Sequence, residues 1–274
     1  MQQIRDRVFV ETRIQGSNPG FVVTDECLVM IDSPQQPSDA MKWRKAIEGK
    51  GEIRYLINTE PHGDHVIGNF FFPGAVISHE KTKEALSSLS VEMIVDKIKD
   101  IDPEGLPLME GYFLKTPSIT FSEDLSLHLG KHTFELIHLP GHTAGQTAVY
   151  IPEERLVFTG DNIFHKVQSY LHQAYPEEWL KSLKRIEELD VDVIVPGHGE
   201  LCDKKYLKEQ ASFIREWVEA VSDAIKQGLS KEEAKAKISF LDRYPMDIGL
   251  AWRGPQVQGM NVERLYDLLK QPSR

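Results

Sequence analysis

Short apolar runs and longer amphipathic segments follow one another along the chain, with turn residues between them. Short apolar runs bounded by turn residues predict strands, and here they cover residues 8–10, 20–24, 27–32, 53–57, 75–78 and 191–195. Strands also dominate between residues 119 and 158, where Leu129, Gly130 and Lys131 predict a hairpin. Strands therefore account for much of the expected structure.

Amphipathic segments predict helices in the other parts of the chain. Pro37 opens a helix over residues 38–48, and Gly49 ends it. Further helices are expected at residues 64–70, 80–99, 176–189, 206–225 and 262–269. Residues 102–111 are rich in Pro and Gly, so this segment predicts a loop.

The order of these elements indicates the fold class. Strand blocks with helices between and after them predict an α+β fold in which two packed sheets have helices outside them, a four-layer αββα sandwich. We expect this catalytic domain over residues 1–203, with a helical extension over residues 204–274 packed on it. The chain has 274 residues and 41% hydrophobic content, which suffices for one large core.

One short segment concentrates groups that bind metals. Directly after the apolar run 53–57, the chain places two carboxylates and two imidazoles within six positions, namely Glu60, His62, Asp64 and His65. Pro61 and Gly63 interrupt regular structure, so these side chains project from a tight loop at a strand end. A short, rigid loop of this kind can hold several ligands around one divalent ion.

Three more strand ends carry the same kinds of side chain. His142, Asp161 and His198 each lie beside a glycine, straight after an apolar run. A single His beside Gly is usually a turn residue or a hydrogen-bonded surface group. Four strand ends that each deliver such ligands indicate a site at the open edge of a sheet, where a rigid scaffold positions the loops.

In this arrangement the chain resembles the metallo-β-lactamase superfamily, over about residues 8–201. The signature of that superfamily is His-x-His-x-Asp-His, followed by a lone His, a bridging Asp and a last His. The resemblance implies the αββα fold and two Zn²⁺ ions. It implies one metal site built from Glu60, His62 and His142, and a second built from Asp64, His65 and His198, with Asp161 bridging the two.

The first position of the signature departs from the family, because Glu60 replaces a histidine. A carboxylate oxygen can ligate zinc at about 2.0–2.2 Å, but its charge and hardness favour iron or manganese more than imidazole does. The alternative is that Glu60 turns away, which leaves the site of His62 and His142 partly occupied or empty. Metal identity and the number of ions are therefore open at this point.

Hydrolysis is the chemistry that such a centre implies. A divalent metal lowers the pKa of a bound water to about 7, so hydroxide is available at neutral pH. We expect a metal-dependent hydrolase of a small-molecule ester, lactone, thioester or amide. The alternatives are an iron-dependent oxidoreductase of the same fold, similar to persulfide dioxygenases, and β-lactamase or phosphodiesterase activity. A metal-stabilised binding protein is a third class, which open coordination positions disfavour.

Candidate catalytic residues lie in and after the metal loops. Asp64 could orient the attacking water and pass a proton to the leaving group. Tyr170 and His172, and with them His165, follow Asp161 and could donate a hydrogen bond to the oxyanion. Tyr244 and Trp252 mark an irregular tail that we expect to fold over the pocket as a substrate wall. Packing is the alternative role for each of these residues.

Charge and hydropathy limit the partners that we expect. A formal net charge of −10 disfavours a nucleic-acid partner, because Lys and Arg supply most of the affinity for phosphates. No run approaches the roughly 18–20 apolar residues of a membrane span, and residues 1–13 are polar, so we expect a cytoplasmic protein. The expected partner is a small-molecule substrate. The last helix is expected to act as a lid or a dimer element, which leaves a homodimer open.

Overall fold

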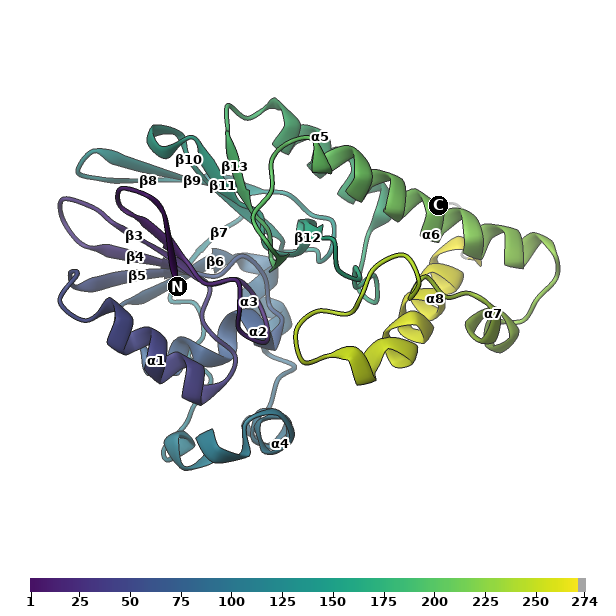
Figure 1. Cartoon of the computed structure of the whole chain (residues 1–274), viewed down its shortest axis with the longest axis horizontal. Coiled ribbons are helices and arrows are strands. Elements are labelled where there is room, and N and C mark those ends of the chain that lie inside the picture. The colour runs from purple at the N-terminus through teal and green to yellow at the C-terminus, as the bar shows by residue number, and fades with distance from the viewer. Residues whose placement is uncertain (271–274) are drawn as a thin grey trace.

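Two β-sheets lie face to face in the computed structural model, which describes residues 1–270 (Figure 1). The first sheet has seven strands in sequence order: β1 (Gln2–Arg5), β2 (Val8–Val10), β3 (Gly20–Val23), β4 (Leu28–Ile31), β5 (Ile53–Ile57), β6 (Ala75–His79) and β7 (Ile119–Phe121). Strands β1 to β4 pair antiparallel, whereas β4 to β7 pair parallel. The carboxyl ends of the parallel strands therefore meet at one edge.

The second sheet has five strands in the order β13-β11-β10-β9-β8. These are β8 (Leu125–Leu129), β9 (His132–His138), β10 (Thr147–Ile151), β11 (Leu156–Phe158) and β13 (Val193–Val195). Only β11 and β13 pair parallel in this sheet. A small parallel pair, β12 (Phe164–His165) and β14 (His198–Gly199), lies apart from both sheets.

Helices cover the outer faces of both sheets. The α-helices are α1 (Pro37–Ile47), α2 (Gly63–Val66), α3 (Glu80–Leu86), α4 (Val91–Ile101), α5 (Pro176–Glu188), α6 (Tyr206–Lys226), α7 (Lys231–Lys237) and α8 (Gly254–Lys270). Short 3₁₀ helices are η1 (Ile67–Phe71), η2 (Pro103–Met109), η3 (Pro152–Glu154), η4 (Gly160–Asn162) and η5 (Ala251–Arg253). Of the helices within residues 1–270, none combines the length and apolar composition that crossing a membrane requires.

The alternation of side chains along β4 shows why two layers of core form. All four residues of β4 are buried. Val29 and Ile31 pack against residues of the second sheet, such as Phe134, whereas Leu28 and Met30 pack against Trp43 of α1. Successive side chains of a strand point to opposite faces, so a strand buried on both faces must be apolar throughout. This arrangement is the predicted four-layer αββα sandwich.

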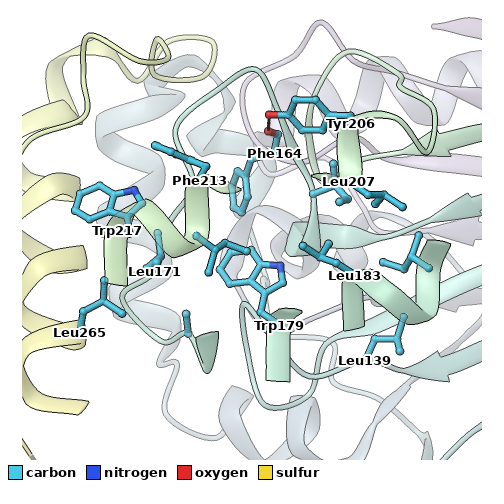
Figure 2. Packing of buried hydrophobic residues seen from close by; sticks show 14 of the residues in the cluster. Leu139, Phe164, Leu171, Trp179, Leu183, Tyr206, Leu207, Phe213, Trp217 and Leu265 are labelled. Atoms are coloured by element: carbon cyan, nitrogen blue, oxygen red, sulfur yellow. Dashed lines mark hydrogen bonds between the residues drawn. The ribbon is translucent and has the colours of Figure 1, made fainter. Parts of the chain in front are cut away.

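A third hydrophobic cluster joins the second sheet to the C-terminal helices (Figure 2). Trp179 of α5 and Trp217 of α6 are both fully buried, and Leu265 of α8 packs in the same cluster. Large aromatic side chains bury about 150–250 Å² each and dominate such cores. The C-terminal helices therefore share a core with α5, and the domain boundary after residue 203 stays a prediction of the sequence.

Four expected elements differ from those observed. The helix expected over residues 64–70 is the short α2 followed by the 3₁₀ helix η1. The single helix expected over residues 80–99 is two helices, because Ser90 accepts a hydrogen bond from the Met93 backbone amide and caps α4. The expected loop over residues 102–111 contains η2, which the Asp102 side chain caps through the Gly105 amide. The last helix begins at Gly254, eight residues before the expected start.

Candidate metal centre

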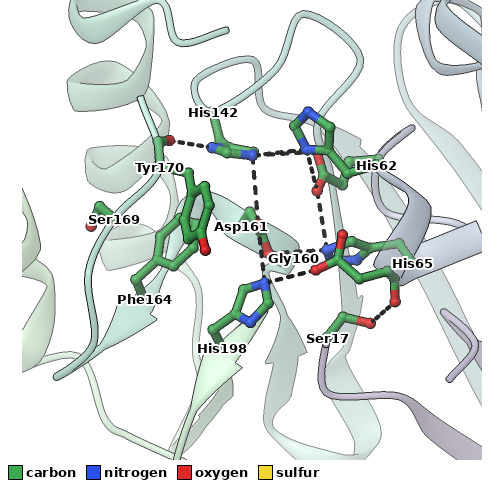
Figure 3. A network of polar contacts seen from close by, with 12 residues as sticks. Ser17, His62, His65, His142, Gly160, Asp161, Phe164, Ser169, Tyr170 and His198 are labelled. Carbon is green, nitrogen blue, oxygen red and sulfur yellow. Dashed lines mark hydrogen bonds and ion pairs between the residues drawn. The ribbon is translucent and has the colours of Figure 1, made fainter. Parts of the chain in front are cut away.

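Four loops converge at the edge where the parallel strands of the first sheet end (Figure 3). The loop after β5 carries Glu60 and His62 and continues into α2, which holds Asp64 and His65. The loops after β9 and β11 place His142 and Asp161, and His198 follows β13 in β14. All seven side chains predicted as metal ligands therefore lie together.

These seven side chains form two groups that could each hold a metal ion. Within each group the potential ligand atoms lie within 4.8 Å of one another, the first group being Glu60, His62, His142 and Asp161, and the second being Asp64, His65 and His198. In the first group, His62 Nδ1 lies 3.0 Å from both Glu60 Oε1 and His142 Nε2. In the second group, His198 Nε2 lies 3.3 Å from Asp64 Oδ2.

Two carboxylates connect the groups. Asp161 Oδ2 lies 3.5 Å from His142 Nε2 and 3.3 Å from His198 Nε2, and its Oδ1 lies 3.1 Å from His65 Nε2. Asp161 thus occupies the bridging place that the resemblance implies. Glu60 also contacts both groups, because its Oε1 lies 3.0 Å from His65 Nε2 and its Oε2 lies 3.7 Å from His142 Nε2. Glu60 is fully buried and does not turn away from the cluster.

Hydrogen bonds at Nδ1, on the side of the ring that faces away from the cluster, orient three of the imidazoles. His65 Nδ1 lies 2.9 Å from Asp32 Oδ2, His142 Nδ1 donates to the Tyr170 carbonyl at 2.7 Å, and His198 Nδ1 lies 2.7 Å from Asp247 Oδ2. An ionised carboxylate and a carbonyl only accept, so each Nδ1 carries the hydrogen. Each Nε2 then faces the cluster, where a cation would displace any proton that it carries, and an Nδ1 hydrogen bond of this kind is the usual support of a metal-ligating histidine.

Polar atoms at the centre lack well-formed hydrogen bonds within residues 1–270. Glu60 Oε2, His65 Nε2 and Asp161 Oδ1 are buried and make close polar contacts, such as the 3.1 Å from His65 Nε2 to Asp161 Oδ1, but no hydrogen bond of suitable geometry. Buried polar atoms are nearly always hydrogen-bonded or bound to a metal. A donor set of imidazole nitrogens and carboxylate oxygens with unused lone pairs fits a divalent cation.

The electrostatics of the cluster depend on its mixed charges. Burial acts to raise the pKa of Glu60, but the surrounding imidazoles outweigh burial and lower it to about 2. Burial acts to lower the pKa of His65 and of His198, yet their neighbouring carboxylates raise both well above the usual value. The cluster therefore keeps its carboxylates ionised, which is the state that binds cations.

Asp32 positions both the metal loop and one imidazole, a role that no sequence motif indicated. Its carboxylate accepts hydrogen bonds from the Thr59 amide at 2.8 Å and the Thr59 hydroxyl at 2.7 Å, in addition to the contact with His65. Asp32 has a φ of 53°, in the left-handed region that non-glycine residues seldom adopt. Strained backbone of this kind concentrates at functional sites, where surrounding bonds hold it.

Gly197 allows the loop before His198 to approach Asp161. A Cβ atom at Gly197 would lie 1.9 Å from Asp161 Oδ1, which no side chain can tolerate. The Pro-Gly-His sequence therefore requires glycine at position 197 for this close approach.

Asp247 is the other functional residue that sequence reasoning missed. It lies between α7 and η5, 49 positions from its partner His198, and both side chains are buried. The ring of Phe164 stacks on His198 at a centroid distance of 5.2 Å, so the imidazole is fixed by one hydrogen bond and one aromatic face. No motif marks this aspartate, since the pattern around it is irregular.

A cavity of about 300 Å³ opens above the cluster. Tyr170 and His172 both line it, whereas His165 turns away and lies 2.8 Å from the Glu200 carbonyl through Nδ1. The Tyr170 hydroxyl is buried and has no hydrogen-bond partner in the described part of the chain, and burial raises its pKa to about 12. Burial, with the nearby His62 and His142, lowers the pKa of His172 to about 3. Both side chains are therefore neutral near pH 7, and their catalytic roles stay predictions.

The irregular tail does reach this cavity, though through other residues than expected. Leu250 and Arg253 line the cavity, together with Val257 and Met260 of α8. Trp252 instead is 66% exposed, and Tyr244 packs in the cluster around Trp217. The tail therefore forms a wall of the pocket, whereas Tyr244 takes the packing role given above as its alternative and Trp252 is exposed.

Comparison with known proteins supports the same interpretation. The family model of the Metallo-beta-lactamase superfamily matches residues 13–198. The chain is 33% identical over 205 residues to a hydroxyacylglutathione hydrolase of Bartonella henselae, which covers 72% of this chain and 66% of that protein. It is 27% identical over 207 residues to the 2,4-dinitroanisole O-demethylase subunit alpha of Nocardioides sp. (strain JS1661), covering 71% of this chain and 54% of that protein.

Solved structures share the fold at low sequence identity. The sec-alkylsulfatase Pisa1 from Pseudomonas sp. superposes with a TM-score of 0.70 and 15% identity, over 98% of this chain and 50% of that chain. A metallo-beta-lactamase from Pontibacter korlensis gives a TM-score of 0.61 and 20% identity, over 78% of this chain and 97% of that chain. The alignments with the demethylase subunit and the hydroxyacylglutathione hydrolase named above span about half and about two thirds of the length of those proteins.

Proposed function

Because the chain belongs to the metallo-beta-lactamase superfamily, we propose that it is a metal-dependent hydrolase of a small-molecule ester, lactone, thioester or amide. The observation that carries the proposal is the convergence of seven ligand side chains beneath one cavity. The hydroxyacylglutathione hydrolase relatives favour a thioester among these substrates.

We assign Glu60, His62, His142 and Asp161 to one metal position, and Asp64, His65 and His198 to the other, with Asp161 shared. Divalent ions held there would polarise the carbonyl group of the substrate and lower the pKa of water to about 7. Zn²⁺ is the first candidate, since imidazoles and carboxylates both suit it. The protein's own residues then account for binding, orientation and proton transfer.

Asp64 is placed to handle a proton. It lines the cavity and its side chain is 21% exposed, whereas Asp161 is 5% exposed. Ser17 donates a hydrogen bond to the Asp64 carbonyl at 2.6 Å, which fixes the backbone that carries this carboxylate. An ionised carboxylate at the floor of the cavity can accept a proton from water and return it to the leaving group.

Tyr170 and His172 supply neutral donors to the same space. The Tyr170 hydroxyl has no partner within residues 1–270, and neither has His172 Nδ1. The His172 ring lies 4.9 Å from that of His62, so it overhangs the first group of ligands. A protonated hydroxyl aimed into a water-poor cavity can stabilise the negative charge that develops on a carbonyl oxygen.

The decisive experiment compares ligand variants with a matched histidine variant. We expect His142→Ala and His198→Ala to lose most of the turnover, because binding of a metal supplies several kcal/mol of transition-state stabilisation. His128→Ala is the control, since His128 lies on the exposed face of β8. Near-normal turnover in both ligand variants, with the fold retained in circular dichroism, would rule out the proposed centre.

The substrate is identified by direct screening. Lactones, thioesters, phosphodiesters and β-lactams are tested on protein loaded with zinc, manganese or iron. Turnover of thioesters or esters, with little for the phosphodiesters, is the expected result. Preferential turnover of a β-lactam or a phosphodiester would replace the proposed substrate class.

Glu60 favours one alternative function, an iron-dependent oxidoreductase similar to persulfide dioxygenases. Three of the seven proposed ligands are carboxylates, and Glu60 contacts both groups. Hard, charged ligands favour iron or manganese over zinc. Oxygen uptake with a persulfide substrate, after anaerobic loading with Fe²⁺, would establish this alternative, and its absence alongside hydrolysis of esters would exclude it.

A further inference from the structure

Two basic side chains line the cavity above the metal centre, although the protein as a whole is acidic. Lys97 comes from α4 and Arg253 from η5, so the cavity brings together residues that are far apart in the sequence. The formal net charge is −10, so acidic residues outnumber basic ones in the chain, and Asp64 and Asp161 line the same cavity as the two cations.

Neither cation has a carboxylate partner among residues 1–270. Arg155, Arg243 and Lys231 all form salt bridges within 4.0 Å, whereas Lys97 and Arg253 form none. The Arg253 Nε atom is buried and has no hydrogen-bond partner. Its guanidinium lies 5.0 Å from the centroid of the Trp252 ring, so an aromatic face supports the side chain without neutralising it.

Lys97 lies close to the metal loop. A methyl group at Gly63 would be 3.5 Å from Lys97 Nζ, and the Asp64 carboxylate is the opposing charge that acts on the ammonium group. Burial lowers the pKa of Lys97, with Asp64 acting to raise it and Arg253 acting to lower it. The Asp64 carboxylate lies 3.3 Å from His198 Nε2 and makes no salt bridge with Lys97 within 4.0 Å.

We propose that Lys97 and Arg253 form an anion-binding subsite, and that the substrate is a small acyl compound that carries a negatively charged group away from its scissile bond. This inference rests on the proposed hydrolytic function of the same cavity. A partly desolvated cation that lacks a counter-ion is stabilised by an anionic ligand, and Arg in particular binds carboxylate, sulfate and phosphate through paired hydrogen bonds.

The other residues that line the cavity indicate the polarity and the size of this substrate. Leu89, Ile101, Leu250, Val257 and Met260 line the same cavity and supply apolar surface. A cavity of about 300 Å³ lies at the lower end of the range for small-molecule sites. The substrate is therefore a compact molecule that combines an apolar part with an anionic group.

A matched pair of chromogenic esters tests the subsite in catalysis. Mono-4-nitrophenyl adipate and 4-nitrophenyl hexanoate have acyl chains of equal length, and only the adipate carries a terminal carboxylate. We expect Lys97→Met and Arg253→Met to raise the KM for the adipate about tenfold each, because a charged hydrogen bond is worth about that factor in affinity. The kcat for the adipate, and both constants for the hexanoate, are expected to change less than about twofold.

Binding without turnover separates this inference from the proposed function. Isothermal titration of the purified protein with hexanoate, hexane-1-sulfonate and hexyl phosphate, against neutral 1-hexanol, tests the subsite and shows which anion it prefers. We expect Lys97→Met to weaken the preferred anion about tenfold, Lys97→Arg to retain most of the binding, and Lys99→Met to leave it unchanged. Lys99 is the control because it lies on the same helix, exposed and paired with Asp96.

The outcomes are distinguishable. If the anions bind through Lys97 and Arg253 but no ester is hydrolysed, the subsite stands and the proposed function fails. If esters are hydrolysed but the anions bind no better than 1-hexanol, or bind equally well to Lys97→Met, the subsite is overturned. Melting temperatures of the variants show whether each one is folded. If Arg253→Met does not fold, the result for Lys97→Met alone tests the subsite.

Discussion

Replacement of Asp247 tests whether the C-terminal segment supports the metal centre. Asp247 Oδ2 lies 2.7 Å from His198 Nδ1, and both residues are buried, at 7% and 3% exposure. Asp247→Ala removes the acceptor that holds the Nδ1 hydrogen, so the imidazole loses its fixed tautomer, its orientation and part of its basicity. Asp247→Asn keeps the shape and an acceptor oxygen but removes the negative charge.

The expected magnitude follows from this one hydrogen bond. A hydrogen bond to a charged group is worth about 1.5–3 kcal/mol when it is buried. Loss of an outer partner of a metal-binding histidine costs about 10- to 100-fold in metal affinity, which corresponds to about 1.4–2.7 kcal/mol. The two ranges agree, so we expect about a 100-fold loss for Asp247→Ala and about a tenfold loss for Asp247→Asn.

Competition with a chromophoric chelator measures the metal affinity of each variant directly, without any assay of activity. Asp242→Ala is the control, because Asp242 lies in the same segment and is exposed. Unchanged metal affinity in Asp247→Ala would refute the reasoning. A lower melting temperature of the metal-free variant with unchanged affinity would assign Asp247 a purely structural role.

Three other substitutions probe the site. Glu60→His removes one negative charge and restores the family signature, so the ratio of zinc to iron and manganese in protein purified without added metal should rise in elemental analysis; unchanged metal identity and count would argue against ligation by Glu60. Gly197→Ala places a Cβ 1.9 Å from Asp161 Oδ1, so the free energy of unfolding measured by urea denaturation should fall by about 1–3 kcal/mol. Gly259→Ala is the control: its Cβ would have its nearest neighbour at 3.6 Å, so the free energy of unfolding should stay the same or rise. Tyr170→Phe removes a hydroxyl without a partner, so kcat should fall about 10²- to 10³-fold with little change in KM or stability, and an unchanged kcat would remove Tyr170 from the mechanism.

Local pattern was sufficient to predict the framework and the position of the candidate ligands. Strands such as β5 were predicted within a residue of their bounds, because burial imposes an apolar run on the sequence itself. Ligands follow those runs directly, so His142, Asp161 and His198 could be assigned to strand ends before any contact was known. The break between α3 and α4 was missed, since three serines within residues 87–90 bond to the backbone and only the structure shows that they end one helix and start another.

The residues that orient the metal ligands could not be predicted, because their contacts are between distant parts of the chain and leave no periodic pattern in the sequence. Asp32 and Asp247 hold imidazoles 33 and 49 positions away, and neither lies in a motif. The cations Lys97 and Arg253 resemble ordinary surface residues in the sequence, and only the fold turns them towards one cavity. Periodicity records which face of an element is buried, so the sequence alone determined the layers and the ligand-bearing loops. Which distant side chains then meet depends on how those layers pack, and only the tertiary structure decided it.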